Sequence, residues 1–222
     1  MEDQVGLMER IWQAIGRQLR HPAGWAGIMA GWLMSVLNER PSRAAIAALN
    51  VLSGERILEL GFGSGCSLAT LSARYPDARL SGIDASGAML AMARRKNRGA
   101  LLEGRISLVQ GEFSPLPFPE GSFDKILLVN VVYFFDVDGN DIADAYRVLR
   151  PGGRLVAYAT ERSTMRRWPF AGAETHRTFD ADALRALFEQ GGFEPSHIRV
   201  ERLELPFGIA GLLTIIDKGC DL

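Results

Sequence analysis

The sequence predicts an α/β fold in which helices cover both faces of a mostly parallel β-sheet. Short apolar runs alternate with helical segments along most of the chain, and one of these runs leads directly into a glycine-rich turn. One of the longer runs, Phe123 to Val129, suits a strand that is covered on both faces. No internal repeat and no long linker interrupts the pattern, so we expect a single compact domain.

The N-terminal part of the chain is predicted to be helical. Apolar side chains recur at four-residue steps from Leu7 to Leu19, which indicates an amphipathic helix. His21-Pro22 ends this helix, a second apolar helix runs to about Leu37, and Pro41 begins a third. Strands are then expected at 56–60, 78–83, 106–109, 123–129 and 154–159, with helices at 67–74, 86–98 and 142–149 and a turn at Pro151-Gly152-Gly153.

The last part of the chain has a different pattern. Asp180 is expected to cap a helix over 181–190, which Gly191-Gly192 would end. Strands at 196–203 and 209–217 follow, and the short connection between them leaves no room for a crossover helix. We therefore expect these two strands to pair antiparallel.

Charge and cysteine content limit the function. The chain has 222 residues, with 25 Lys and Arg against 26 Asp and Glu, so its formal net charge is −1. A near-neutral chain has no general field for nucleic acid, so a small-molecule partner is expected instead. Cys66 and Cys220 fit neither a disulfide framework nor the ligand spacing of a zinc site. With no secretory signal recognised, we expect a cytoplasmic protein and no metal.

The most informative segment is the run Glu59-Leu-Gly-Phe-Gly-Ser-Gly65, which follows the strand at 56–60. Glycine permits positive φ and lets a ligand approach the backbone closely. Asp84 ends the next strand, where an acidic side chain can accept hydrogen bonds from ribose hydroxyls. A dinucleotide fingerprint would need its third glycine at the position of Cys66, so a nicotinamide-dependent oxidoreductase is the alternative and not the first interpretation.

The glycine run resembles motif I of the class I S-adenosylmethionine-dependent methyltransferases, E/D-x-G-x-G-x-G. The resemblance extends through SGIDASGAMLAMARRK and AYRVLRPGGRLVAYA and covers about residues 55–222. It is strongest with the small-molecule branch, the ubiquinone-biosynthesis-like or type 11 enzymes. It implies a Rossmann-like seven-stranded, mostly parallel sheet with an antiparallel last strand. A methyltransferase domain over 53–222 would then follow an N-terminal helical cap or lid over 1–52.

The resemblance implies S-adenosylmethionine as the cofactor, S-adenosylhomocysteine as the product, and a set of contact residues. Gly61, Gly63 and Gly65 would pass under the methionine and ribose, and Asp84 would hold the ribose hydroxyls. The remaining implied contacts are Glu59 to the glycine loop or the amino group, Ala85 and Met89 near the adenine, Glu112 and Phe113 at the adenine amino group and ring, and Asn130 at the methionine end. Core packing is the alternative for Met89 and Phe113, and a solvated loop position for Glu112. Phe62 stands where a smaller residue is frequent, and is expected to narrow the pocket.

Methyl transfer by direct displacement mainly requires alignment, and a general base is needed only if the acceptor loses a proton. Two catalytic candidates follow. Tyr133 is expected to face the methyl group or to be a core aromatic. His176 is a candidate base, and an exposed loop histidine is the alternative. Arg166, Arg167 and Trp168 would bind an anionic acceptor group or form a solvated basic loop.

The apolar N-terminal helices give an indication of the class of acceptor. As a lid they would favour a small aromatic, prenylated or lipid-like acceptor; the residues concerned are Trp12, Trp25, Met29, Trp32 and Met34. The same surface could instead form a homodimer contact or a peripheral membrane contact. A non-catalytic module that binds the cofactor or a lipid is the remaining alternative for the whole chain.

Overall fold

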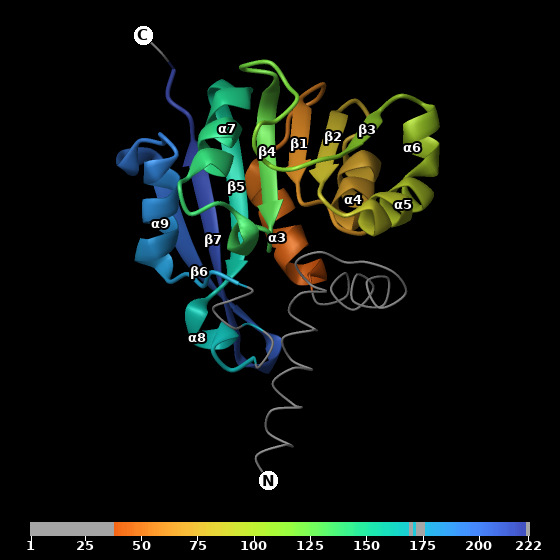
Figure 1. The fold of residues 1–222 in the computed structure, drawn as a ribbon. Coiled ribbons are helices and arrows are strands. Elements are labelled where there is room, and N and C mark those ends of the chain that lie inside the picture. The colour runs from red at the N-terminus through yellow and green to blue at the C-terminus, as the bar shows by residue number, and fades with distance from the viewer. Residues whose placement is uncertain (1–37, 169–170, 172–175, 221–222) are drawn as a thin grey trace.

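The computed structural model describes residues 38–168, 171 and 176–220. The first two predicted helices, and with them the tryptophans and methionines of the predicted lid, lie outside these residues. The described chain forms a seven-stranded sheet in the order β3-β2-β1-β4-β5-β7-β6 (Figure 1). The strands are β1 (Arg56–Leu60), β2 (Arg79–Asp84), β3 (Ile106–Gln110), β4 (Phe123–Val129), β5 (Leu149–Thr160), β6 (Ile198–Leu205) and β7 (Ile209–Asp217).

The predicted antiparallel last strand is confirmed. β7 runs antiparallel to both of its neighbours, β5 and β6, whereas β1 to β5 are parallel to one another. It follows that β6 runs in the same direction as β1 to β5. The carboxyl ends of these six strands therefore lie at one edge of the sheet, which is the lower edge in Figure 1.

β5 is longer than predicted and contains the predicted turn. Phe123 pairs with Leu149, but Lys125 pairs with Arg154, so the residues between form a bulge in the strand. Gly152 has a φ of +71° at this bulge. The turn signal of Pro151-Gly152-Gly153 was therefore correct locally, although the chain remains in the strand on both sides of it.

Helices cover both faces of the sheet. They are α3 (Glu39–Leu49), α4 (Cys66–Arg74), α5 (Gly87–Lys96), α6 (Arg98–Leu102), α7 (Asn140–Val148), α8 (Arg162–Met165) and α9 (Ala181–Gln190), together with the short 3-10 turns η1 (Val132–Phe134), η2 (Pro195–His197) and η3 (Pro206–Gly208). Alternate residues of β1 and β4 enter two separate apolar clusters. One cluster joins the sheet to α7 and α9, and the other joins it to α3, α4 and α5.

The observed caps agree with the predicted ones. The Ser86 hydroxyl accepts a hydrogen bond from Met89 N and so caps α5, and the Asp180 carboxylate accepts one from Ala183 N at the start of α9. α3 falls within the predicted cap of residues 1–52, yet its Ile46 and Leu49 are buried against the sheet. In the structure, α3 is thus part of a layer of the main domain.

Phe62 does not narrow a ligand site, contrary to the prediction. Its side chain is buried in the apolar cluster that includes Leu68 and Leu108. A Cβ built on Gly82, in the neighbouring strand, would lie 2.7 Å from Phe62 Cδ1. The ring therefore occupies the space that the missing side chain of Gly82 leaves over β2.

We expect Gly82→Ala to lower the free energy of unfolding by about 1–3 kcal/mol, because the added methyl group overpacks the core against the Phe62 ring. Urea denaturation followed by circular dichroism measures this change. Phe62→Leu should recover part of the loss in the double variant, since it removes the clashing ring atoms. Equal stability of Gly82→Ala and the parent chain would contradict the packing described for Phe62.

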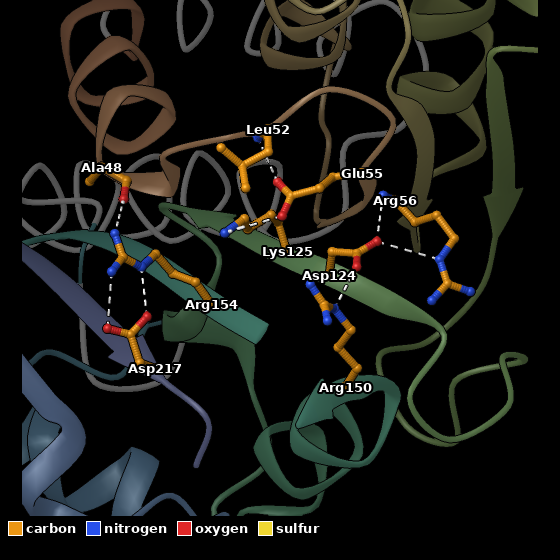
Figure 2. A network of polar contacts seen from close by, with 9 residues as sticks. All are labelled: Ala48, Leu52, Glu55, Arg56, Asp124, Lys125, Arg150, Arg154 and Asp217. Carbon is orange, nitrogen blue, oxygen red and sulfur yellow. Dashed lines mark hydrogen bonds and ion pairs between the residues drawn. The ribbon is translucent and has the colours of Figure 1, made fainter. Parts of the chain in front are cut away.

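Charged side chains connect the strands at the edge opposite their carboxyl ends (Figure 2). The buried Lys125 Nζ lies 3.5 Å from Glu55 Oε1, and Glu55 Oε2 accepts a hydrogen bond from Leu52 N at 2.8 Å. Arg154 binds the Asp217 carboxylate through Nε and Nη2 at 2.7 and 3.0 Å, which lowers the pKa of Asp217. These contacts join residues just before or within β1, β4 and β5 and at the end of β7, so they tie neighbouring strands together at this edge.

Candidate cofactor site

The glycine turn lies between β1 and α4, at the carboxyl edge of the sheet. Gly61 N donates a hydrogen bond to Ile83 O at 2.8 Å, which ties the beginning of the turn to the end of β2. Gly61, Gly63 and Gly65 have φ values of +69°, +52° and +76°. Residues other than glycine rarely adopt this backbone conformation, which explains why the turn has glycine at all three positions.

The three glycines differ in what surrounds them. A Cβ on Gly61 would lie 2.4 Å from Val131 Cγ2, and a Cβ on Gly65 would lie 2.7 Å from Asn97 Nδ2. A Cβ on Gly63 would meet no atom of the described chain within 4 Å. Gly61 and Gly65 are thus required by the protein's own packing, whereas the described residues leave open space beside Gly63.

Asp84 lies beside this open space. Its Oδ2 accepts a hydrogen bond from Gly63 N at 2.8 Å, and its Oδ1 accepts one from Ser86 N at 2.9 Å. The side chain is 8% exposed. The structure therefore brings the acidic end of β2 and the middle of the glycine turn together, as the sequence predicted.

Glu59 is buried under the glycine turn, with 2% of its surface exposed. Its Oε2 has no hydrogen-bond partner among the described residues. Burial raises the pKa of the Glu59 carboxyl to about 8, against the effect of a hydrogen bond with Ser67, and the nearby Asp84 and Cys66 raise it further. A buried oxygen without a partner is costly, so this position suits a ligand that brings a hydrogen-bond donor or a cation.

The open space at Gly63, the carboxylate of Asp84 and the Oε2 atom of Glu59 together fit a nucleoside that carries an amino group. The same edge carries Ala85, which is half-buried, and Met89, which is buried. Glu112 is exposed, and Phe113 is half-buried with its ring 5.2 Å from that of Phe135. The roles of these four residues toward a cofactor stay predictions.

Asn130 follows β4 and joins several parts of the site. Its backbone is left-handed, with a φ of +53°. Its Oδ1 accepts a hydrogen bond from the Tyr133 hydroxyl at 2.6 Å, and its Nδ2 donates to Asn38 Oδ1 at 2.7 Å. The backbone N of Thr160 donates to the Tyr133 hydroxyl oxygen. Asn130 is therefore held by β5 and by the residue that precedes α3.

Tyr133 and His176 lie next to each other, although 43 positions separate them in the sequence. Their ring centroids are 6.1 Å apart, and the His176 ring lies 5.0 Å from that of Phe134. His176 is 6% exposed, so the alternative of an exposed loop histidine is wrong. Burial raises the pKa of the Tyr133 hydroxyl, which acts here as a neutral donor to Asn130.

The basic residues after β5 do not enter this group of aromatic side chains. Arg166 and Arg167 are exposed, and Arg167 Nη2 donates to Gly208 O at 2.5 Å. Trp168 packs against the core. Cys66 begins α4 with its Sγ 3.3 Å from Ser64 Oγ, and it is half-buried. In the described part of the chain, no group of three or more His, Cys, Asp or Glu residues could hold a metal ion.

We expect Gly63→Ala to weaken cofactor binding strongly, because its methyl group would enter the open space beside Asp84. The positive φ adds a folding cost of about 1–2 kcal/mol. Calorimetric titration with S-adenosylhomocysteine and thermal unfolding separate the two effects. Gly61→Ala is the matched comparison: its Cβ clashes with Val131, so it should lower stability more. If Gly63→Ala binds S-adenosylhomocysteine as tightly as the parent chain, the open space beside Gly63 is not part of the cofactor site.

Fold and site together define a nucleoside-cofactor protein of the α/β class, and three comparisons agree with this. The methyltransferase domain family matches residues 57–153. The uncharacterized methyltransferase YdaC of Bacillus subtilis is 30% identical over 179 residues, which are 80% of this chain and 92% of YdaC. The demethylmenaquinone methyltransferase of Tropheryma whipplei is 41% identical over 115 residues, which are 51% of this chain but only 45% of that enzyme.

A solved structure extends the similarity to the fold. Phosphoethanolamine N-methyltransferase 2 of Haemonchus contortus, in complex with S-adenosylmethionine, superposes with a TM-score of 0.68 at 14% identity, covering 82% of this chain and 53% of that one. The chain belongs to the class I small-molecule S-adenosylmethionine-dependent methyltransferases. The cofactor of this family is S-adenosylmethionine, and membership in it argues against the nicotinamide-dependent oxidoreductase.

Four residues of the site were missed by the sequence reasoning. Asn97 Nδ2 donates to Gly65 O at 3.1 Å, Asn38 and Thr160 hold the Asn130–Tyr133 pair, and Val131 packs on Gly61. Each acts across elements that are far apart in the chain. Only Asn97 carried a local signal, since an asparagine at the end of a predicted helix commonly caps it.

Proposed function

We propose that this protein transfers the methyl group of S-adenosylmethionine to a small, largely apolar acceptor with an aromatic or quinone-like ring. The observation that carries the proposal is the group of rings next to Asn130. Tyr133 and His176 are buried, Phe134 is half-buried, and Phe179 adds a ring 6.5 Å from that of Tyr133. Flat apolar walls of this kind favour stacking with a flat acceptor.

The demethylmenaquinone methyltransferase of Tropheryma whipplei, named for a quinone-related acceptor, supports the same class of acceptor for this chain. S-Adenosylmethionine supplies, when bound, a methyl group on a positively charged sulfur. The residues of this chain then have to orient the acceptor and exclude water. We propose that the ring group serves this purpose, with Tyr133 held in place by its hydrogen bond to Asn130.

His176 is proposed as the general base. Methylation of a ring carbon or a hydroxyl oxygen forms one bond to the methyl group, breaks the bond from methyl to sulfur, and leaves a proton on the acceptor. A histidine within the ring group can accept that proton and pass it to water. Tyr133 is proposed as a positioning residue, because its hydroxyl proton is committed to Asn130 Oδ1.

The proposed reaction is tested by measuring S-adenosylhomocysteine formation by the full chain. The acceptors are a naphthoquinol with an unsubstituted ring carbon, phosphoethanolamine, and DNA. We expect turnover with the naphthoquinol alone. Turnover only with phosphoethanolamine or DNA would contradict the acceptor class, and cofactor binding without turnover on any acceptor would favour a non-catalytic module.

We expect His176→Gln to lower kcat on the order of 100-fold, because the acceptor proton would lose its base. Steady-state kinetics with the naphthoquinol across a pH series measures the change. The affinity for S-adenosylhomocysteine should stay unchanged, and the acidic limb of the pH profile should disappear. If kcat and the pH profile remain those of the parent chain, His176 is not the base.

A further inference from the structure

The turn between β6 and β7 carries an unusual side chain. Phe207, the middle residue of η3, is 97% exposed. Its backbone is left-handed, with φ +64° and ψ +23°, a conformation that is a true outlier for a bulky residue. The chain thus tolerates both an unfavourable backbone and an aromatic ring in water at one position. Non-glycine residues held in such a backbone conformation concentrate at functional positions.

The position of this turn relates it to the cofactor site. β6 runs parallel to β1–β5, so its last residue, Leu205, lies at the same edge of the sheet as the glycine turn. Figure 1 shows the turn beside α8, below the ends of β4 and β5. The turn that carries the exposed Phe207 therefore lies at the same edge of the sheet as the glycine turn, with β4, β5 and β7 between β1 and β6.

α8 is fastened to this turn and adds positive charge. Thr164 Oγ1 accepts a hydrogen bond from Ala210 N at 2.9 Å, and Arg167 donates to Gly208 O. Arg166 and Arg167 are exposed, and neither forms an ion pair with any described residue. Arg202 binds both Glu161 and Glu204, at 2.9 and 2.5 Å, so these three side chains leave one negative charge against the two positive charges of Arg166 and Arg167. The surface formed by η3 and α8 thus carries an exposed aromatic ring beside a net positive charge.

We propose that η3 and α8 form a docking element for an anionic membrane surface, in which Phe207 inserts among the lipid headgroups and Arg166 and Arg167 pair with lipid phosphates. One ring on a narrow turn buries roughly 150–250 Å², far below the roughly 800 Å² per partner of a stable protein interface. A bilayer requires no such area, and cationic side chains beside an inserted aromatic add to binding. A membrane is accordingly favoured over a protein partner.

Docking in this orientation would place the carboxyl edge of the sheet against the bilayer, where apolar acceptors dissolve. The inference goes beyond the proposed methyl transfer and does not depend on it. In the part of the chain that the structure describes, no helix is long and apolar enough to cross a membrane, so the proposal concerns contact with the surface.

Vesicle flotation with the full chain, without cofactor or acceptor, tests the proposal. The vesicles are pure phosphatidylcholine or equal parts phosphatidylcholine and phosphatidylglycerol, each at low and at high salt. We expect binding to the anionic vesicles that weakens with salt. Phe207→Asn, which tolerates the left-handed backbone, should bind at least about tenfold more weakly. Its melting temperature should equal or exceed that of the parent chain, because asparagine relieves the unfavourable φ.

Two further variants make the test specific. Leu102→Asn removes an 80% exposed apolar side chain from α6, near the β3 end of the sheet, and should bind like the parent chain. Arg166→Gln should lower the salt dependence. The proposal would be overturned if the parent chain did not bind the vesicles, or if Phe207→Asn and Leu102→Asn lost equal vesicle affinity. It would also be overturned if light scattering showed an oligomer of the parent chain that the Phe207→Asn variant does not form. Methyl transfer to a short, water-soluble quinol should be the same in Phe207→Asn, which separates this result from the proposed function.

Discussion

Replacing Asp84 with alanine is expected to weaken binding of S-adenosylhomocysteine by about 1,000-fold. A hydrogen bond to a charged group contributes about 1.5–3 kcal/mol, and the Asp84 carboxylate is predicted to accept one from each ribose hydroxyl. Each of its oxygens accepts one backbone N–H, from Gly63 or Ser86, and a carboxylate oxygen accepts more than one hydrogen bond. The substitution therefore removes the ribose contacts and also loosens the glycine turn.

Two variants separate these effects in calorimetric titrations. Asp84→Asn keeps the shape and one acceptor oxygen, so it should lose less affinity than the alanine variant. Asp138→Ala removes an exposed carboxylate after β4 and should leave the affinity unchanged. An Asp84→Ala chain that binds the product normally would show that the ribose is held elsewhere, and the cofactor position proposed here would fail.

The fold was predictable from the sequence because its signals are local. The strand that ends at Leu60, the glycine turn after it and the cap at Ser86 are each recognisable from a few neighbouring residues in the sequence. The antiparallel β7 was predictable for the same reason, since Pro206 and its neighbours leave no room for a crossover. Within the site, the strand–turn–helix–strand pattern placed Asp84 and the glycine turn at the same edge of the sheet, and the Asp84–Gly63 hydrogen bond shows that they lie together.

Features that depend on contacts between distant segments were not predictable. Phe62 looked like a pocket residue, yet its ring turns into the core because Gly82, on the next strand, leaves space for it. Exposure was the alternative for His176 because a lone histidine in a loop is commonly exposed, but its ring is buried next to those of Tyr133 and Phe134. Neither partner is recognisable without knowing which strands are neighbours.

The buried carboxyl of Glu59 should make the stability of the protein depend on pH in an unusual direction. Its pKa rises from about 4.5 in an unfolded chain to about 8 in the folded one, so the folded chain holds the proton more tightly. The resulting stabilisation is fully present below about pH 4.5 and is lost as the pH rises toward 8. A single group changes the free energy of unfolding by at most about 1.4 kcal/mol per pH unit.

Urea denaturation at several pH values between 5 and 8 measures this slope. Glu59→Gln cannot ionise, so its stability should vary less with pH than that of the parent chain. Glu120→Gln, which changes an exposed glutamate, should retain the parent's slope. If Glu59→Gln and the parent chain show the same pH dependence, Glu59 is ionised in the folded protein at neutral pH.

The same carboxyl should also couple cofactor binding to proton release. Near pH 7 the free protein holds Glu59 protonated, whereas a bound amino group would favour the carboxylate and so displace the proton. Affinity for S-adenosylhomocysteine should then rise with pH, by at most about tenfold per unit, until the pKa of Glu59 is passed. Calorimetry in buffers of different ionisation enthalpy should detect a proton released by the parent chain and none by Glu59→Gln. The glutamine of the variant has no ionisable proton to release when the ligand binds. If the parent chain and Glu59→Gln nevertheless release equal numbers of protons, those protons do not come from Glu59, and the cationic end of the cofactor lies away from it.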